Sequence, residues 1–381
     1  MEIVCDYNIC TGCGLCVAEC PKQCISLTKR GHLDHFYPQI DTHICIDCGL
    51  CKKKCPAIRN VILKKAQIAF AAWSRDENDY VSSSSGGAGA VFSKHVILNG
   101  GSVYGCAMLP NVEVKHIRVD NAENLEMLKG SKYVQSNIIE IIPLLKEDVN
   151  LGHTTLFIGT PCQVAAIKSL YKVQPKNLIL VDIICHGVPS LDLLKKHIKK
   201  VAPSSHYDSI SFRKGTNFFL LVREGEKVIY NRPLSWPPFK EWYMDTFFYG
   251  YTYRQSCYQC RYACPERISD ITIGDFWGLG EHLSTDDIPP HQNGCSVIMP
   301  ITHKGRQFVH NISHMMNLYV RPVEEAINGN DQLRAPVYLS RRRRVFRWLY
   351  SYIGKKAYYI SIADIIFKNQ LHHIIKKFTQ S

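Results

Sequence analysis

The sequence predicts a chain of mixed α+β and α/β class with three parts. A small cysteine-rich module comes first, an α/β domain with a partly parallel sheet follows, and a basic, mainly helical region ends the chain. Three observations predict this order: a cysteine run that occurs twice before residue 56, strand–loop–helix repeats further along, and four consecutive arginines at residues 341–344. We place the three parts at residues 1–62, 63–325 and 326–381.

The duplicated cysteine run determines the nature of the first module. The order C-x2-C-x2-C-x3-C-P occurs at Cys10, Cys13, Cys16 and Cys20, and again at Cys45, Cys48, Cys51 and Cys55. This spacing holds two 4Fe-4S clusters in bacterial-type ferredoxins, where the fourth cysteine of each run ligates the other cluster. We therefore assign one cluster to Cys10, Cys13, Cys16 and Cys55, and the other to Cys45, Cys48, Cys51 and Cys20.

A zinc site and a disulfide framework are the alternatives for this run. Zinc binds four ligands that usually come in pairs, whereas each run here has three close cysteines and a fourth before a proline. Disulfides need an oxidising compartment, and 17 cysteines in 381 residues are too few for a disulfide scaffold. Cys5 and Cys24 lie outside the pattern, and we expect them to be spare thiols.

Composition favours a cytoplasmic protein. The chain opens without a signal-peptide pattern, and no apolar run approaches the roughly 18 residues that span a bilayer. The formal net charge is +13, but a cluster held by four thiolates carries about two negative charges and a bound dinucleotide adds about two more. The charge therefore gives no argument for nucleic-acid binding.

Three loops of the α/β domain carry residue types found in ligand sites. Residues 82–87 are four serines and two glycines directly before an expected helix at residues 88–98, so free N–H groups at its start would suit a phosphate. A flexible Ser/Gly linker is the alternative. The expected strands at residues 154–158 and 178–184 lead into loops with Cys162 and Cys185. Such strand ends hold ligands in open α/β sheets, although a lone cysteine there is more often a small buried residue.

A further cysteine pair, Cys257 and Cys260, is followed by Cys264 and Pro265. Alone, the pair fits a zinc site, a redox dithiol or part of a cluster site. A complete cluster would need more cysteines, and Cys162, Cys185 and Cys264 are the candidates. The aromatic-rich stretch before the pair, residues 236–253, has an irregular start at residues 236–239 that no pattern places.

Together, these motifs resemble the coenzyme F(420) hydrogenase/dehydrogenase beta-subunit family, which includes 7-hydroxymethyl chlorophyll a reductase. The resemblance covers residues 1 to about 300. It is carried by SSGG at residues 84–87, GTPCQ at 159–163, ICHGVPS at 184–190, and the pair at 257–260 with SDITIGDFWG at 269–278. It implies that the α/β domain is a flavin-binding domain with FAD and a cluster of its own.

The same resemblance implies which residues hold these groups. A third 4Fe-4S cluster would be ligated by Cys162, Cys185, Cys257 and Cys260, while Cys264 departs from the family pattern and leaves the fourth ligand open. The flavin would be lined by Ser84, Ser85, Gly86, Gly87, Lys132, Tyr133, Gln135, Ser136, Thr160 and Pro161, with Lys132 offsetting the pyrophosphate charge.

The leading function hypothesis is an iron-sulfur flavoprotein oxidoreductase. Electrons from a ferredoxin-like donor would pass through the clusters to FAD and on to an unidentified substrate, such as a deazaflavin coenzyme or a metabolite of cell-surface polysaccharide synthesis. His186 is the candidate proton donor, and a structural histidine is the alternative. The second hypothesis is an electron-transfer beta subunit of a larger hydrogenase/dehydrogenase complex without its own substrate site. A scaffold that has lost its redox role is the third.

The expected partners are a redox protein, namely ferredoxin or a hydrogenase/dehydrogenase subunit, and a small-molecule acceptor. The basic and aromatic region from residue 339 to Lys377 suggests peripheral contact with the inner membrane face or a partner protein. Nucleic-acid contact and a solvated helix packed on the main domain are the alternatives.

Overall fold

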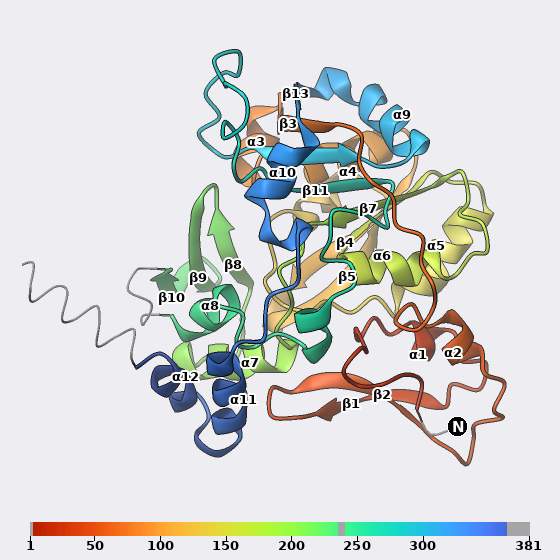
Figure 1. Ribbon diagram of the computed structural model, residues 1–381, viewed down its shortest axis with the longest axis vertical. Helices are drawn as coiled ribbons and strands as arrows, with labels where there is room; N and C mark the ends of the chain where they lie inside the picture. The colour runs from red at the N-terminus through yellow and green to blue at the C-terminus, as the bar shows by residue number, and fades with distance from the viewer. Residues whose placement is uncertain (1–2, 235–240, 364–381) are drawn as a thin grey trace, which may run out of the picture.

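The computed structural model describes residues 3–234 and 241–363 (Figure 1). The predicted irregular segment at residues 236–239 and the predicted basic tail from residue 364 to Lys377 lie outside the described residues. Within the described ranges, no helix is both long enough and apolar enough to cross a lipid bilayer.

The cysteine-rich module is built from two similar halves. Each has a short helix, α1 (Leu15–Ala18) or α2 (Leu50–Lys54), and the strands β1 (Ile25–Arg30) and β2 (His35–Ile40) pair antiparallel. Gly14 and Gly49 precede the two helices with φ of 77° and 69°. Glycine adopts this left-handed backbone without the steric cost of a side chain, so both turns of the repeat favour it.

An eight-stranded sheet forms the centre of the molecule. Its strand order is β13 (Met316–Arg321), β3 (Ala69–Ser74), β12 (Ser296–Pro300), β11 (Ile271–Asp275), β7 (Leu178–Ile183), β6 (Thr155–Gly159), β4 (Ser102–Leu109) and β5 (Glu113–Val119). The four strands β11, β7, β6 and β4 are parallel, and the flanking pairs are antiparallel. The predicted partly parallel sheet is confirmed.

Helices cover both faces of this sheet. The covering elements are α3 (Glu77–Ser82), α4 (Ala88–Leu98), α5 (Ile141–Asn150), α6 (Pro161–Lys168), α9 (His303–Asn311) and α10 (Val323–Gly329). Helix α7 (Leu191–Val201) packs instead into the core of a smaller sheet. α4 and α9 share one apolar layer with Leu156 and Val181, while α5 and α6 share the other with Phe157 and Leu180. Side chains alternate between the faces along a strand, so β6 and β7 contribute to both layers.

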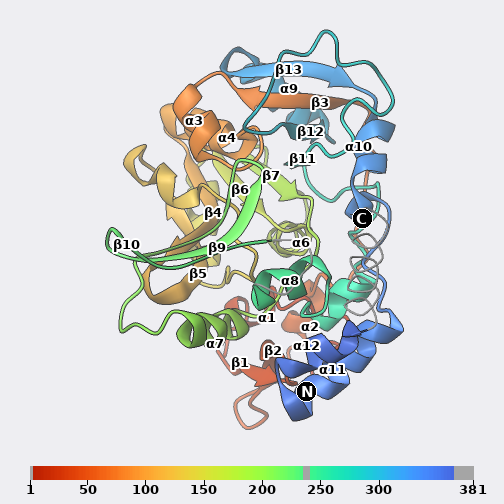
Figure 2. The same ribbon diagram turned by 90° about the vertical axis from the view of Figure 1, so that its left-hand side faces the viewer.

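A smaller, three-stranded sheet packs beside the large one. It has the order β10 (Lys227–Pro233), β9 (Asn217–Glu224) and β8 (Ser209–Lys214). Its core includes Phe212 and Leu220 together with α8 (Trp242–Phe248), α11 (Arg341–Ile353) and α12 (Lys356–Ser361). Both views place α11 and α12 at the same end of the molecule as β1 and β2 (Figures 1 and 2).

Short 3-10 helices complete the connections: η1 (Pro110–Val112), η2 (Glu123–Leu128), η3 (Gln255–Gln259), η4 (Ser313–Met315) and η5 (Asp331–Leu333). The division into residues 1–62, 63–325 and 326–381 stays a prediction.

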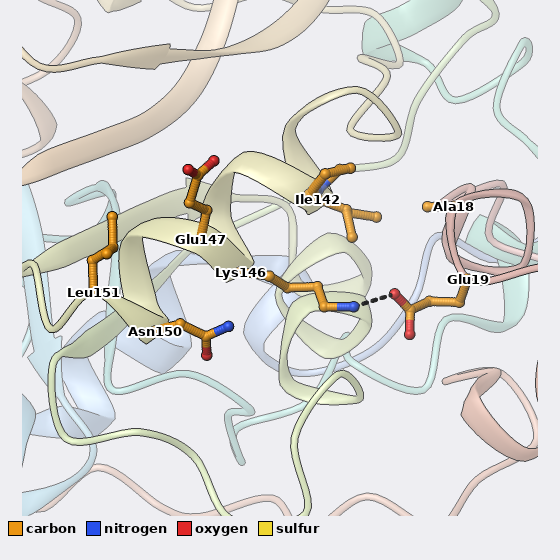
Figure 3. Close-up of a pocket in the computed structure, with 8 residues that line it drawn as sticks. Ala18, Glu19, Ile142, Lys146, Glu147, Asn150 and Leu151 are labelled. Carbon is orange, nitrogen blue, oxygen red and sulfur yellow. Dashed lines mark hydrogen bonds and ion pairs between the residues drawn. The ribbon is translucent and has the colours of Figure 1, made fainter. Parts of the chain in front are cut away.

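The cysteine-rich module is fixed to α5 by apolar and ionic contacts. Leu15 enters the apolar layer of α5 and α6. Next to a surface groove, Glu19 accepts a hydrogen bond from Lys146 of α5 at 3.1 Å (Figure 3) and also binds Lys54. Burial alone would raise the pKa of Glu19, but the two lysines outweigh it and lower this pKa. Glu19 is therefore an ionised link between the module and the α/β domain.

Candidate iron-sulfur and flavin sites

Cysteines from both halves of the repeat form a first thiol group. Burial, and then Cys13, Cys10 and Cys55, raise the pKa of the Cys16 thiol. The pKa of Cys13 is raised to about 11, first by burial, with further contributions from Cys55 and Cys10. The four thiols therefore lie close together, and they are the set that the crossed ligand pattern assigns to one cluster.

A second thiol group lies nearer the surface. Burial, and then Cys20 and Cys48, raise the pKa of Cys51. A small internal void is lined by Cys20, Cys24, Cys45, Cys48 and Cys51. Cys48 is exposed, so this group lies closer to solvent than the first.

The two thiols outside the repeat lie beside these groups. Cys5 is buried and interacts with Cys10 and Cys55. The Sγ atoms of Cys24 and Cys20 are 3.4 Å apart. Each thiol group therefore has one extra cysteine next to it, which spacing alone does not reveal.

A third thiol group forms in the α/β domain. Cys162 lies in the first turn of α6, Cys185 follows β7, Cys257 lies in η3 and Cys260 directly after it. Burial, and then Cys257, Cys162 and Cys260, raise the pKa of the Cys185 thiol. Among the described residues, no three His, Cys, Asp or Glu side chains are placed to hold a single metal ion, so the group is wider than a mononuclear site.

Cys264 is oriented toward its own loop. Its thiol donates to the carbonyl oxygens of Glu266 at 3.2 Å and Arg261 at 3.6 Å. The geometry therefore favours the other four cysteines as the third group.

The first and third thiol groups are adjacent. Burial and neighbouring thiols raise the pKa of Cys162 to about 12, and one of those neighbours is Cys13 of the cysteine-rich module. The buried hydroxyl of Tyr262 lies within the electrostatic influence of both Cys162 and Cys13. The contact between the two domains thus brings their thiol groups together.

A cavity of about 770 Å³ borders the third group, within the range of about 300–1,000 Å³ typical of small-molecule sites. Its wall includes the ends of β6, β7 and β11, the start of α4, and Phe247 and Phe248 of α8. Cys185 and His186 also line it. The cavity thus lies at the carboxyl ends of three parallel strands, where open α/β sheets bind ligands.

Helix α4 begins in this wall without a capping side chain. Its N-cap is Gly87, with φ of 79°, and no side chain caps the first turn. The hydroxyl of Ser83, which also lines the cavity, is buried and has no hydrogen-bond partner among the described residues. Free N–H groups at a helix start favour an anion, so this end of the cavity suits a phosphate.

The serines after Ser83 are held by partners across the cavity. Ser84 Oγ accepts a hydrogen bond from the Ser131 N–H at 3.0 Å. Ser85 Oγ donates to the Asp275 carboxylate, which also accepts two hydrogen bonds from Arg213 at 2.6 and 2.7 Å. The loop is therefore ordered by these contacts, in contrast to a free linker.

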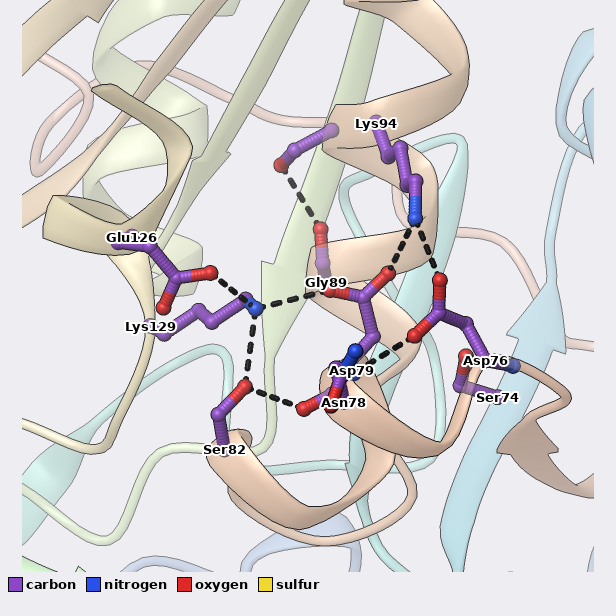
Figure 4. A network of polar contacts seen from close by, with 10 residues as sticks. Ser74, Asp76, Asn78, Asp79, Ser82, Gly89, Lys94, Glu126 and Lys129 are labelled. Atoms are coloured by element: carbon purple, nitrogen blue, oxygen red, sulfur yellow. Dashed lines mark hydrogen bonds and ion pairs between the residues drawn. The ribbon is translucent and has the colours of Figure 1, made fainter. Parts of the chain in front are cut away.

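Two of the lysines near α4 are neutralised by carboxylates. Asp79 accepts hydrogen bonds from Lys94 at 3.0 Å and Lys129 at 2.8 Å (Figure 4). Lys94 also pairs with Asp76, and Lys129 with Glu126. Three carboxylates balance two lysines here, so this network adds no net positive charge to the cavity.

Lys132 is the cavity lysine whose hydrogen bonds go to carbonyl groups. Its Nζ donates to Lys129 O at 2.7 Å and Leu128 O at 2.9 Å, and none of the ion pairs in the described residues includes it. Burial lowers its pKa to about 8. A half-buried ammonium without a carboxylate partner among the described residues favours an anionic ligand.

The opposite part of the cavity is aromatic. The rings of Tyr133 and Phe247 stack with centroids 4.7 Å apart, and Phe218 and Phe248 pack around them. His186 borders the same space, and partial desolvation there lowers its pKa. This end suits a flat ring system.

Comparisons with known proteins agree with this geometry. The family model for "4Fe-4S dicluster domain" matches residues 9–58, and the model for the C terminus of "Coenzyme F420 hydrogenase/dehydrogenase, beta subunit" matches residues 152–326. The chain carries an F420 hydrogenase/dehydrogenase beta-subunit domain behind a 4Fe-4S dicluster domain. The family resemblance that the motifs predict is thereby confirmed.

Other comparisons add little to this assignment. A solved structure of the F420-reducing [NiFe] hydrogenase complex from Methanosarcina barkeri contains a chain with 17% identity and a TM-score of 0.47, covering 72% of this chain and 93% of that one. A TM-score of this size is too low to carry an argument. A comparison with curated proteins gave no significant match.

The matched beta-subunit domain contains part of the predicted site. Its residues 152–326 include the third thiol group, Thr160, Pro161 and His186, whereas residues 84–87 and 132–136 precede it. Of the predicted flavin residues, seven line the cavity: Ser84, Ser85, Gly87, Lys132, Tyr133, Ser136 and Thr160.

Gly86, Gln135 and Pro161 do not line this cavity. A Cβ at Gly86 would lie 2.1 Å from Ala72 O, so glycine lets the loop pack on β3. The Gln135 amide donates to Thr11 O at 3.0 Å and so binds the dicluster domain. Pro161 is the first residue of α6, a position that suits its fixed φ and missing N–H.

Sequence patterns missed several residues of the site. Ser83, Ser131 and Asp275 line the cavity, and Ser131 and Asp275 also hydrogen-bond to Ser84 and Ser85. Ser83 lies in the serine-glycine run at residues 82–87 and Asp275 in the motif at residues 269–278. Membership of these motifs was the sequence signal that could have identified the two residues. Ser131 gives no local signal, because its partner Ser84 is 47 residues away.

Proposed function

We propose that this chain is an iron-sulfur flavoprotein oxidoreductase. The cysteines of the dicluster domain would hold two clusters that accept electrons, Cys162, Cys185, Cys257 and Cys260 would hold a third 4Fe-4S cluster, and the 770 Å³ cavity would hold FAD as the electron acceptor. The observation that carries this proposal is the position of Cys185, which belongs to the third thiol group and also lines the cavity.

Residues of the cavity fit both ends of FAD. The uncapped start of α4, the unpartnered Ser83 hydroxyl and Lys132 suit the pyrophosphate. Tyr133 and Phe247 would pack against the flavin ring. When bound, FAD would supply the exchange between single electrons, as clusters carry them, and electron pairs.

The chain's own side chains would exclude water and manage protons. Tyr133, Phe218 and Phe248 cover the aromatic end of the cavity, which lowers the local dielectric and strengthens polar contacts inside it. His186 is open to the same space, and its pKa is lowered, so its imidazole is placed to exchange a proton with a substrate. A structural role for His186 is the alternative.

Iron and flavin content test this function. Anaerobically purified protein should hold about twelve iron atoms, four for each cluster, and one FAD. Cys185→Ser and Cys257→Ala should each lower the iron content to about eight, whereas the control Cys264→Ser should leave it at the wild-type value. A wild-type protein with eight iron atoms and no flavin would contradict the proposal.

The alternative is an electron-transfer beta subunit without a substrate site of its own. The matched family model, which describes hydrogenase and dehydrogenase beta subunits, favours it equally. Oxidation of a reduced donor by the isolated chain with a small acceptor, such as a deazaflavin, supports the enzyme. Activity that requires a stably co-purifying catalytic subunit supports the alternative.

We also propose peripheral contact of α11 with an anionic membrane. Trp348 and Tyr352 are 62% and 73% exposed on this helix, Arg341 and Arg344 are exposed on its first turn, and Phe346 is buried on the other side. Exposed aromatic rings beside cations are typical of helices that lie in the membrane interface. Sedimentation should show binding to phosphatidylserine vesicles that Trp348→Ala weakens. Equal binding to neutral vesicles would contradict a role of the arginines in attracting the helix to anionic lipid.

A further inference from the structure

Arg254 is a fully buried cation between the dicluster domain and the third thiol group. It is 1% exposed. Its Nε donates to Cys10 O at 2.7 Å, and its Nη2 donates to Phe36 O at 2.8 Å and approaches Cys10 Sγ at 3.6 Å. The guanidinium carbon also lies 4.1 Å from the centroid of the Tyr37 ring.

No carboxylate among the described residues pairs with this guanidinium; its contacts are carbonyl groups, a thiol, the Gln135 amide oxygen and an aromatic face. The other buried arginines of the described residues, Arg213, Arg267 and Arg321, pair with Asp275, Asp182 and Glu325. Burying a cation without a counter-charge is costly. The position of Arg254 therefore calls for an anion next to Cys10.

The surrounding residues are arranged to hold the guanidinium there. A Cβ at Gly12 would lie 2.6 Å from Arg254 Cζ, so only glycine leaves room at this point of the cysteine loop. Gln135 contacts both Arg254 and the carbonyl groups of Thr11 and Gly12. The side chain is thus fixed against the loop that carries Cys10 and Cys13.

The backbone of Arg254 is fixed to the third thiol group. Its N–H donates to Val188 O, three residues after Cys185, and its carbonyl oxygen accepts from the Cys257 N–H, both at 2.9 Å. One residue therefore positions the Cys257 loop with its backbone and reaches Cys10 with its side chain.

We propose that Arg254 is a positioning residue that raises the reduction potential of the cluster on Cys10, Cys13, Cys16 and Cys55. A cluster with four thiolates is negative, and reduction adds one more negative charge, so a buried cation stabilises the reduced form. The second group, with exposed Cys48, lies closer to solvent. The raised potential would favour electron transfer from the exposed cluster to the one adjoining the third group.

This inference rests on the proposed presence of the clusters, and its test separates the two claims. The proteins are the wild-type holoprotein, Arg254→Gln, Arg254→Lys and the control Arg261→Gln. Arg261 also donates to carbonyl groups of the dicluster domain, but it is exposed, so water screens its charge. Iron content is measured first, and potentials follow from anaerobic redox titration monitored by electron paramagnetic resonance.

Arg254→Gln should keep its iron and make reduction of one dicluster cluster at least about tenfold less favourable, a negative shift of about 59 mV for one electron. Arg254→Lys keeps the positive charge and should retain most of the wild-type potential. Arg261→Gln should leave both potentials at wild-type values. Unchanged potentials in an iron-replete Gln variant would overturn the inference and leave the proposed function standing.

If Arg254→Gln loses its iron, the Arg254→Lys variant distinguishes a role of the positive charge from a role of the hydrogen bonds. A Lys variant that keeps its iron and a near wild-type potential supports a role for the charge. Loss of iron from the Lys variant as well would show that the hydrogen bonds to Cys10 O and Phe36 O hold the loop, and it would overturn the electrostatic role. Wild-type protein without clusters would instead contradict the proposed function.

Discussion

Charged side chains that are paired with an opposite charge differ from those that contact only carbonyl groups, and the difference separates structural residues from candidate functional ones. Arg321 and Glu325 form a buried pair with Nε and Oε2 2.6 Å apart, and each charge is neutralised by the other. Lys132 and Arg254 have carbonyl partners and no carboxylate among the described residues. The Arg254 guanidinium is buried and the Lys132 ammonium is half-buried. Because unpaired charges are unfavourable there, both positions would suit the proposed anionic groups, an FAD phosphate near Lys132 and a cluster near Arg254.

Lys132 gives a pH-dependent prediction. Its pKa is lowered to about 8 in the free protein, and a bound phosphate raises it, so its contribution to FAD affinity is complete below pH 8 and falls as the pH rises above 8. Lys132→Met should weaken FAD binding by about 1.5–3 kcal/mol at pH 7, the usual range for a hydrogen bond to a charged group, and should give a flatter pH profile.

Fluorescence titration of flavin-free protein with FAD at pH 7 and pH 9 measures this effect. Lys115→Met serves as the control. Lys115 lies on the edge strand β5, outside the cavity lining, and pairs with Glu113 and Glu140. Equal wild-type affinities at both pH values would count against a role for Lys132.

At the scale of elements, a buried ion pair connects strand β7 to the loop of the third thiol group. Arg267 Nη2 lies 3.1 Å from Asp182 Oδ2, and Thr272 donates to the same carboxylate at 2.6 Å. Burial raises the pKa of Asp182, while Arg267 opposes this change. Arg267 Nη1 also donates to Tyr262 O at 2.8 Å, so the pair fixes the chain just after Cys260.

Arg267→Met should therefore destabilise the protein by about 3–5 kcal/mol, because it leaves the Asp182 carboxylate buried and unpaired. Urea unfolding under anaerobic conditions, followed by tyrosine fluorescence, measures the change. The double variant Arg267→Met, Asp182→Leu should recover much of the loss, and Arg261→Met should cost no more than about 1 kcal/mol. A double variant no more stable than the single one would argue against the pair as the cause.

Elements with clear end signals could be predicted closely. Helix α4 has the bounds that the sequence predicts, residues 88–98, because Gly87 marks its start. Helix α5 begins only at Ile141, because residues 136–140 form the bridge and hydrogen bonds next to His116. Local pattern predicts an element well, whereas tertiary contacts set its ends.

The site could be predicted in part for a similar reason. Cysteine spacing is a local property, so the dicluster domain was recognisable from the sequence and is confirmed. The partners of Arg254 are not local: Cys10 is 244 residues away, and Phe36 is 218 residues away. No motif identifies such a contact, since it depends on how the two domains pack.

At the scale of the whole molecule, the chain brings three thiol groups and one cavity into a row. The exposed group with Cys48 is followed by the group with Cys10 and Cys13, then by the third group, and Cys185 borders the cavity. The contacts between domains, Arg254 to Cys10 and Lys146 to Glu19, maintain this order. In the proposed function, electrons would follow this order from the surface of the dicluster domain to the cavity.

The most direct test of this path is the rate of flavin reduction in the Cys185→Ser variant, with Cys106→Ser as the control. Cys106 also lines the cavity but lies on β4, on a different element from every member of the third thiol group. Anaerobic stopped-flow absorbance follows flavin bleaching after mixing with a reduced ferredoxin. We predict normal FAD content in both variants, wild-type rates in Cys106→Ser, and rates more than an order of magnitude lower in Cys185→Ser. Flavin reduction at the wild-type rate in an iron-depleted Cys185→Ser protein would contradict the account.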